Sequence, residues 1–171
     1  MADVVAQSTQ PALAAIKLAW WRERLEELDQ GKVPAEPRLQ AAAEELLPRG
    51  VSGRDLARLE DGWAALLDEE PDETRIAGRG AQLFSLGAAL LGAEAGDDVD
   101  LAGRLFALID VVRRGLSDAV PAQPDLRQVA IDRPLRPLTA LSALAARGPL
   151  EPEATPGRAW ALLRHRLTGR I

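Results

Sequence analysis

The chain contains no cysteine, no tyrosine and a single histidine among its 171 residues. Without cysteine it has no disulfides and no thiolate chemistry, which fits a reducing compartment. The single histidine argues against a zinc site built from several histidines and against a catalytic triad built on histidine. These absences exclude thiolate chemistry and argue against histidine-based sites.

A basic surface and a long apolar run are also missing. The net charge is −5, which gives no global case for binding nucleic acid. No run of apolar residues reaches the length needed to span a bilayer, and the first five residues do not resemble a signal peptide. We expect a cytoplasmic protein with no nucleic-acid partner and no transmembrane segment, and a peripheral contact with the inner membrane stays open.

The apolar content, 47% of the chain, is enough for a core and is supplied mainly by alanine and leucine. β-branched and aromatic residues are scarce, and no alternating pattern of useful length is present, so the composition favours helix over strand. The sequence predicts an all-α, single-domain protein over residues 1–171, with a linker at about 119–133. Capping signals and periodicity predict about seven helices, at residues 10–30, 36–47, 52–68, 71–92, 97–118, 134–146 and 155–169.

Two local patterns carry structural predictions. Ser52 and Asp55 form the start of a capping box, which should begin the third helix. The fourth helix contains Gly78, Gly80 and Gly87, each of which costs about 1 kcal/mol relative to alanine. Glycines retained at that cost indicate a close helix contact or a cavity wall.

The first helix has two apolar stripes, which predicts that it packs on two sides. Lys17 and Arg24, seven residues apart, fall between the stripes. Cations in such a position either extend to water or meet an anion in a cavity. The stripes consist of Leu13, Ile16 and Trp20 on one side, and of Leu18, Trp21, Leu25 and Leu28 on the other.

The cluster Lys-x-x-Trp-Trp-Arg at residues 17–22 resembles the early helix of the squalene/phytoene synthase family. Residues 59–63 are similar to the family's Asp-Gly-aromatic helix, and residues 77–92 to its small-residue helix. The resemblance implies a helical bundle like a front-truncated isoprenoid synthase fold. Members of the family join two prenyl diphosphates head to head, with Mg²⁺ held by two aspartate-rich motifs.

Most of those metal ligands are absent from this chain. The family's first aspartate-rich motif precedes the tryptophan pair, but here the residues before Trp20 include a single acid, Asp3. Alignment of the second motif on Gly103 places Arg114 at its first aspartate and Ser117 at its glutamate. A guanidinium repels a metal ion that a carboxylate would attract. The resemblance therefore implies a pseudoenzyme.

The resemblance also assigns candidate site residues. If the chain is active, Mg²⁺ would be held by Asp110, Asp118 and Asp61. The diphosphate would contact Lys17, Arg24 and Arg113, and the prenyl cavity would be lined by Trp20, Trp21 and Gly80.

Each assignment has a structural alternative. Asp110 can pair with Arg113 or Arg114 on its own helix. The tryptophans can be core residues. The basic segment around His165, near a helix C-terminus, is expected to be solvated, since cations there suit the helix dipole.

Three functional hypotheses follow. The first is a catalytically degenerate family member that binds a prenyl diphosphate or a protein partner, similar to the branch that contains a respiratory complex I assembly factor. The second is an active, Mg²⁺-dependent prenyltransferase of isoprenoid biosynthesis. The third is a helical interaction or assembly module without a ligand. An open core at the missing front helix would favour a homodimer or attachment to a membrane surface.

Overall fold

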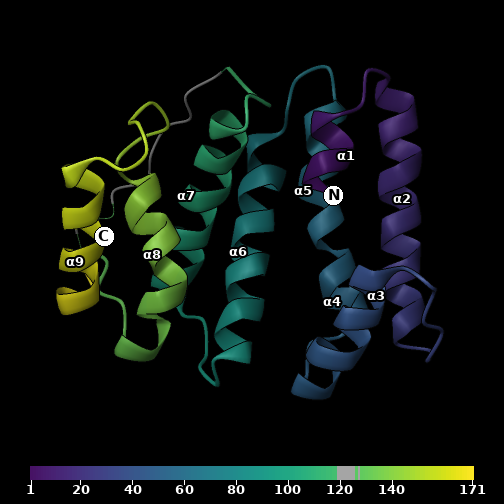
Figure 1. The fold of residues 1–171 in the computed structure, drawn as a ribbon, viewed down its shortest axis with the longest axis horizontal. Helices are drawn as coiled ribbons and strands as arrows, with labels where there is room; N and C mark the ends of the chain where they lie inside the picture. The colour runs from purple at the N-terminus through teal and green to yellow at the C-terminus, as the bar shows by residue number, and fades with distance from the viewer. Residues whose placement is uncertain (119–125, 127) are drawn as a thin grey trace.

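In the computed structural model, residues 1–118, 126 and 128–171 are described, and their regular structure is helical (Figure 1). One isolated antiparallel bridge, between Ala130 and Arg170, is the exception in these residues. The all-α prediction is confirmed. The α-helices in these residues are α1 (Ala2–Ala6), α2 (Pro11–Leu28), α3 (Pro37–Ala41), α4 (Gly53–Ala57), α5 (Leu59–Ala64), α6 (Glu73–Leu90), α7 (Asp97–Arg113), α8 (Arg136–Ala145) and α9 (Pro156–Thr168).

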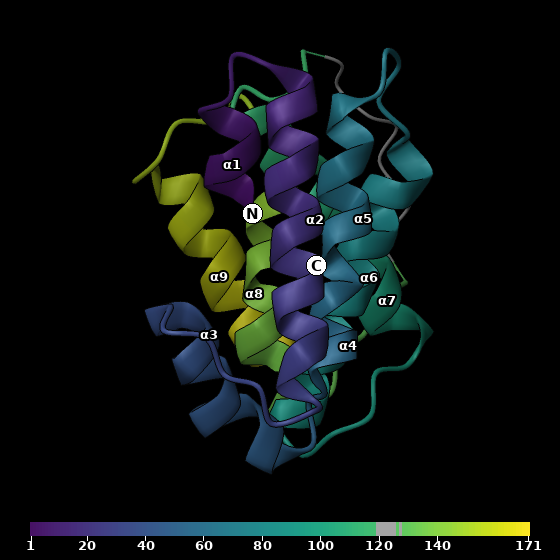
Figure 2. The same cartoon turned by 90° about the vertical axis from the view of Figure 1, so that its right-hand side faces the viewer.

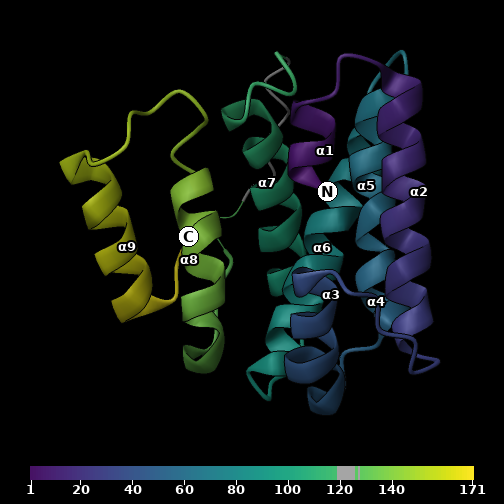
Figure 3. The same cartoon turned by 45° about the vertical axis from the view of Figure 1, so that its right-hand side comes forward.

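The five longest helices and the short α5 stand side by side in a row. From one end of the molecule to the other the order is α9, α8, α7, α6 and α5, followed by α2, and each neighbouring pair is in contact (Figure 1). Figure 2 places α2 in front when the molecule is turned toward that end, and Figure 3 shows α2 and α9 on opposite sides. The two outermost helices therefore pack on one side and present the other to the surroundings.

The third predicted helix is divided in two. The expected capping box is present, with the Asp55 backbone N–H donating to Ser52 Oγ at 3.0 Å. Asp29 at the end of α2 also accepts from the N–H groups of Gly53 and Arg54, at 2.6 and 2.9 Å. The helix breaks at Arg58, where the Asp55 carbonyl accepts from the Gln82 side chain instead of continuing the helical ladder. No local pattern in the sequence indicates this break.

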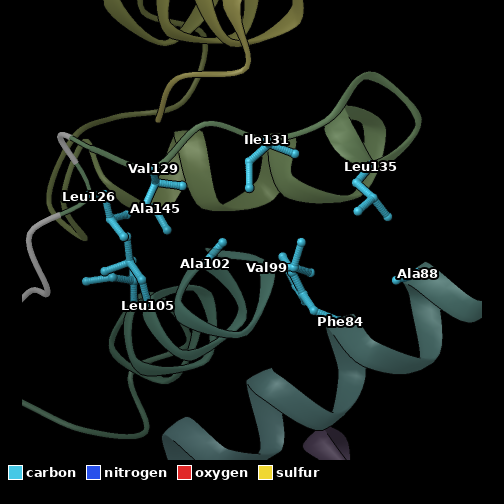
Figure 4. Packing of buried hydrophobic residues seen from close by; sticks show 11 residues of the cluster. Phe84, Ala88, Val99, Ala102, Leu105, Leu126, Val129, Ile131, Leu135 and Ala145 are labelled. Atoms are coloured by element: carbon cyan, nitrogen blue, oxygen red, sulfur yellow. The ribbon is translucent and has the colours of Figure 1, made fainter. Parts of the chain in front are cut away.

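The largest core cluster fills the space between α6, α7 and α8 (Figure 4). Phe84 of α6 and Leu105 and Ile109 of α7 are almost fully buried in it. Of the expected linker at 119–133, residues 119–125 and 127 lie outside the described part of the chain. Three of the remaining residues, Leu126, Val129 and Ile131, belong to this core.

Two predictions about the outer helices are wrong: that α2 packs on two sides, and that the segment around His165 is solvated. One stripe of α2 is buried, at Leu18, Leu25 and Leu28. The other stripe is not, because α2 is the last helix of the row, and it leaves Ile16 67% exposed and Trp20 41% exposed. His165 of α9 is 1% exposed rather than solvated, because it lies on the face that packs against α8. Its Nε2 atom is 2.9 Å from Thr139 Oγ1, and its Nδ1 atom is 3.1 Å from the Arg170 carbonyl.

The α8–α9 connection contains a carboxylate with a shifted pKa. Arg147 donates to both oxygens of Glu151, at 2.8 and 2.9 Å, and Thr155 donates to Oε1 at 2.9 Å. The Arg147 guanidinium lowers the pKa of Glu151 to about 2. We expect Glu151 to protonate near pH 2 in an NMR titration, so that this contact is complete above pH 4.5, the ordinary pKa, and is lost as the pH falls toward 2. Arg147→Gln should move the midpoint back toward 4.5, whereas Arg164→Gln should leave it in place; an unchanged midpoint in Arg147→Gln would contradict the assignment.

Candidate functional site

A buried cation lies between the middle helices. The Arg79 side chain of α6 is 4% exposed and passes between Trp63 of α5 and Asp110 of α7. Its guanidinium carbon is 3.8 Å from the centre of the Trp63 ring, and its terminal nitrogen is 3.7 Å from Asp110 Oδ2. That nitrogen also donates to the Ala107 carbonyl at 3.3 Å. The Nε atom of Arg79 is buried and has no hydrogen-bond partner in the described part of the protein.

Burial sets the electrostatics of this cluster. Desolvation lowers the pKa of Arg79 to about 10, and the Asp110 carboxylate acts in the opposite direction. Arg79 is therefore charged at neutral pH and needs its counter-charge. A second guanidinium, that of Arg114, donates from Nε to Asp110 Oδ1 at 2.8 Å. Each oxygen of the Asp110 carboxylate thus faces an arginine.

Glycines bring the three helices together around this cluster. A Cβ atom on Gly80 would collide with the Gly103 carbonyl, so α6 and α7 approach at a distance that only glycine permits. A Cβ atom on Gly62 would collide with the Cβ atom of Arg79, so α5 also passes close to α6. The close helix contact predicted from the glycine pattern is present at Gly80. Gly80 therefore belongs to a helix contact in the middle of the row, away from the tryptophan pair on α2.

The candidate metal ligands are distributed over separate contacts. Asp110 is held by two arginines, as described. Asp61 is exposed on α5 and forms an ion pair with Arg75 at 2.8 Å. Asp118 lies exposed beyond the end of α7. Across the described ranges, no three histidine, aspartate or glutamate side chains gather closely enough to hold a metal ion.

The three candidate diphosphate contacts also differ in their surroundings. Arg24 pairs with Glu27 at 2.9 Å on its own helix. Arg113 donates to the carbonyls of Pro149 and Glu151, both at 3.2 Å, and so fastens the loop before α9. Lys17 differs, because no ion pair or hydrogen bond of its ammonium group is found among the residues described.

Lys17 and the tryptophan pair share a groove on the outer side of α2. The groove has a volume of about 290 Å³ and is lined by Val4 of α1 and by Ile16, Lys17, Trp20 and Trp21. The two indole rings meet edge to face, with 5.2 Å between their centres and an angle of 83° between their planes. Trp21 is half-buried and Trp20 is exposed, so the groove has an apolar floor and an open side. It can accept an apolar group beside a cation.

The sequence analysis did not single out Arg79 or Trp63 as site residues. A signal for Arg79 was present, because it lies three residues after Ile76, about 60° away around the helix, and Ile76 is buried. An arginine on the apolar face of a helix needs a buried partner. Nothing local identified that partner as Asp110 of the next helix or Trp63 of the previous one.

Comparisons with protein-family models, with curated proteins and with solved structures found no match for this chain. The similarity to squalene/phytoene synthases thus rests on the sequence motifs alone and stays a prediction. Within the described residues, none of the helices combines the length and the apolar character needed to cross a membrane.

Proposed function

We propose that this protein is a catalytically degenerate relative of the squalene/phytoene synthases that binds a prenyl diphosphate without a metal ion. The observation that carries the proposal is the Lys17 ammonium, which has no partner among the described residues and lies at an apolar groove lined by Trp20 and Trp21. The arginines around Asp110 support the loss of catalysis, and the groove indicates the chemistry of the ligand.

The loss of catalysis has an electrostatic basis. Ionisation of an allylic diphosphate needs a divalent metal to stabilise the leaving group, and Mg²⁺ prefers carboxylate oxygens. Asp110 has Arg79 on one oxygen and Arg114 on the other. A Mg²⁺ ion at Asp110 would have to displace or tolerate both guanidinium groups, and its repulsion by them opposes binding.

The groove suits one end of a prenyl diphosphate. The indole rings, with Ile16 and Val4, offer an apolar surface to a hydrocarbon chain, and the Lys17 ammonium offers a point charge to the diphosphate. A volume of about 290 Å³ is at the lower limit for small-molecule sites, so the groove would hold part of a longer chain. The open side leaves room for the remainder.

The second candidate function, a helical interaction or assembly module, is favoured by a different observation. The exposed apolar stripe of α2 extends past the groove to Leu13, which is 44% exposed. An apolar stripe of this kind fits the face of a protein partner as well as a ligand. Binding of a prenyl ligand at Lys17 distinguishes the two candidate functions, because the interaction module is the one without a ligand.

The test uses the two lysines of the chain as a matched pair. Lys17→Gln should weaken binding of farnesyl diphosphate about tenfold or more, because it removes one charge-assisted contact with the diphosphate. Lys32→Gln, an exposed control beside Gln30, should bind as the unmodified protein does. Affinity is measured by quenching of tryptophan fluorescence, with farnesol as a ligand that lacks the diphosphate. No binding, or equal affinity in both variants, would overturn the proposal and leave the interaction module.

A further inference from the structure

The last helix, α9, presents an apolar stripe to the surroundings. Trp160, Leu163 and Leu167 are 65%, 46% and 68% exposed. At about 100° per residue they fall within about 60° of one another, and their centre is roughly opposite the face that buries Ala161 and His165 against α8. The stripe thus follows from the position of α9 at the end of the row (Figures 1 and 3).

Positive charge flanks this stripe. The segment from Thr155 to Ile171 contains arginines and no acid, in a chain whose net charge is −5. Arg164 lies at one border of the stripe and Arg166 at the other, and both are exposed. The segment itself is therefore basic in a protein of net negative charge, and the nearest acids along the chain, Glu151 and Glu153, precede it in the loop before α9.

A basic groove adjoins the same stripe. It has a volume of about 870 Å³, lies between α9 and the start of α8, and is lined by Arg133 and Arg166 together with Leu162 and Leu167. Arg136, also in the groove, donates hydrogen bonds to the carbonyls of Arg166 and Leu167 at the end of α9. The side chains of Arg133 and Arg166 form no ion pair within the described residues. Two guanidinium groups beside exposed leucines suit a phosphate attached to a hydrocarbon.

We infer that α9 docks on the surface of a lipid bilayer that carries anionic phospholipids. Trp160, Leu163 and Leu167 enter the interfacial region, and Arg133, Arg164 and Arg166 contact headgroup phosphates. A tryptophan–leucine face bordered by arginines is typical of helices that lie in a membrane interface. This surface is distinct from the α2 groove, so the inference does not depend on the proposed function.

The charge pattern argues against the other occupants. A second copy docked symmetrically through α9 would bring two arginine-flanked stripes together, and like charges would oppose the contact. The stripe lies on a convex helix and spans about 10 Å, seven residues at 1.5 Å each. A bilayer surface takes up such a convex, short apolar face without requiring a matching cavity.

The inference is tested by flotation of the purified full chain with lipid vesicles. The protein should float with vesicles of equal parts phosphatidylcholine and phosphatidylglycerol, and should stay behind with phosphatidylcholine alone. High salt should weaken the binding, because it screens the arginine contacts. Equal binding to both kinds of vesicle, or to neither, would overturn the inference.

Two variants with matched controls assign the binding to α9. Arg166→Glu and Leu167→Gln should each reduce vesicle binding about tenfold, through loss of headgroup attraction and of apolar insertion respectively. Arg54→Glu and Leu91→Gln change an exposed arginine and an exposed leucine at other places and should bind normally. Circular dichroism verifies that all four variants are folded. Normal binding by both α9 variants, or equal losses in the controls, would contradict the assignment.

Discussion

Gly80→Val is expected to lower the free energy of unfolding by about 3 kcal/mol or more. A Cβ atom at this position would collide with the Gly103 carbonyl, and it would lie 2.6 Å from the Ala107 Cβ atom. The nearest obstacle is backbone, which cannot move aside as a flexible side chain can. The helices α6 and α7 would therefore have to separate, and the buried Arg79 cluster would be disturbed with them.

Gly78→Ala, two residues earlier on α6, is the matched control. A Cβ atom there has no neighbour within 4 Å, so alanine meets open space and gains helix propensity of up to about 1 kcal/mol. The two variants should therefore shift the midpoint of urea denaturation in opposite directions. If Gly80→Val unfolds at the same urea concentration as the unmodified protein, α6 and α7 do not pack through Gly80 and Gly103.

Asp110→Leu is expected to destabilise the protein by about 3 kcal/mol, because it leaves the Arg79 guanidinium buried without a counter-charge. No other carboxylate within the described part of the chain forms an ion pair with Arg79. Arg79→Met should cost less, since Asp110 keeps its contact with Arg114 at 2.8 Å. The double variant Arg79→Met/Asp110→Leu should recover most of the loss, because replacement of a whole buried ion pair by apolar side chains is often neutral.

Asp61→Asn is the control for this cycle. Its ion pair with Arg75 is exposed to solvent, so the expected change is below about 1 kcal/mol. Chemical denaturation of the unmodified protein, the two single variants and the double variant gives the coupling free energy between Arg79 and Asp110. Additive losses in the double variant would show that the two side chains do not act as a pair.

The helices could be predicted from the sequence where local chemistry determines them. Proline at the first position begins α2, α3 and α9, as expected, and the Ser52–Asp55 capping box begins α4. The pairing of Asp110 with Arg114 one turn later on the same helix was a stated alternative for that carboxylate and is confirmed. These features depend on residues a few positions apart.

The features that could not be predicted depend on which helices become neighbours. Trp63, Arg79 and Asp110 belong to three helices, and their contact follows from close approaches at Gly62 and Gly80. The exposure of Ile16 and the burial of His165 follow from the order of the helices in the row, with α2 and α9 at its ends. Sequence periodicity shows that a helix has an apolar face but does not show which face meets a partner.

The most direct test of the proposed function is a calorimetric titration of the protein with farnesyl diphosphate, in the presence and absence of Mg²⁺. Heats from Mg²⁺ binding to the diphosphate alone are subtracted in a blank titration. With Asp110 held by Arg79 and Arg114, we predict binding whose affinity does not depend on Mg²⁺ and which is weakened by Lys17→Gln. Binding that requires Mg²⁺ and is lost in Asp110→Asn would contradict the account, because it would mean that the carboxylate leaves its arginines to hold a metal.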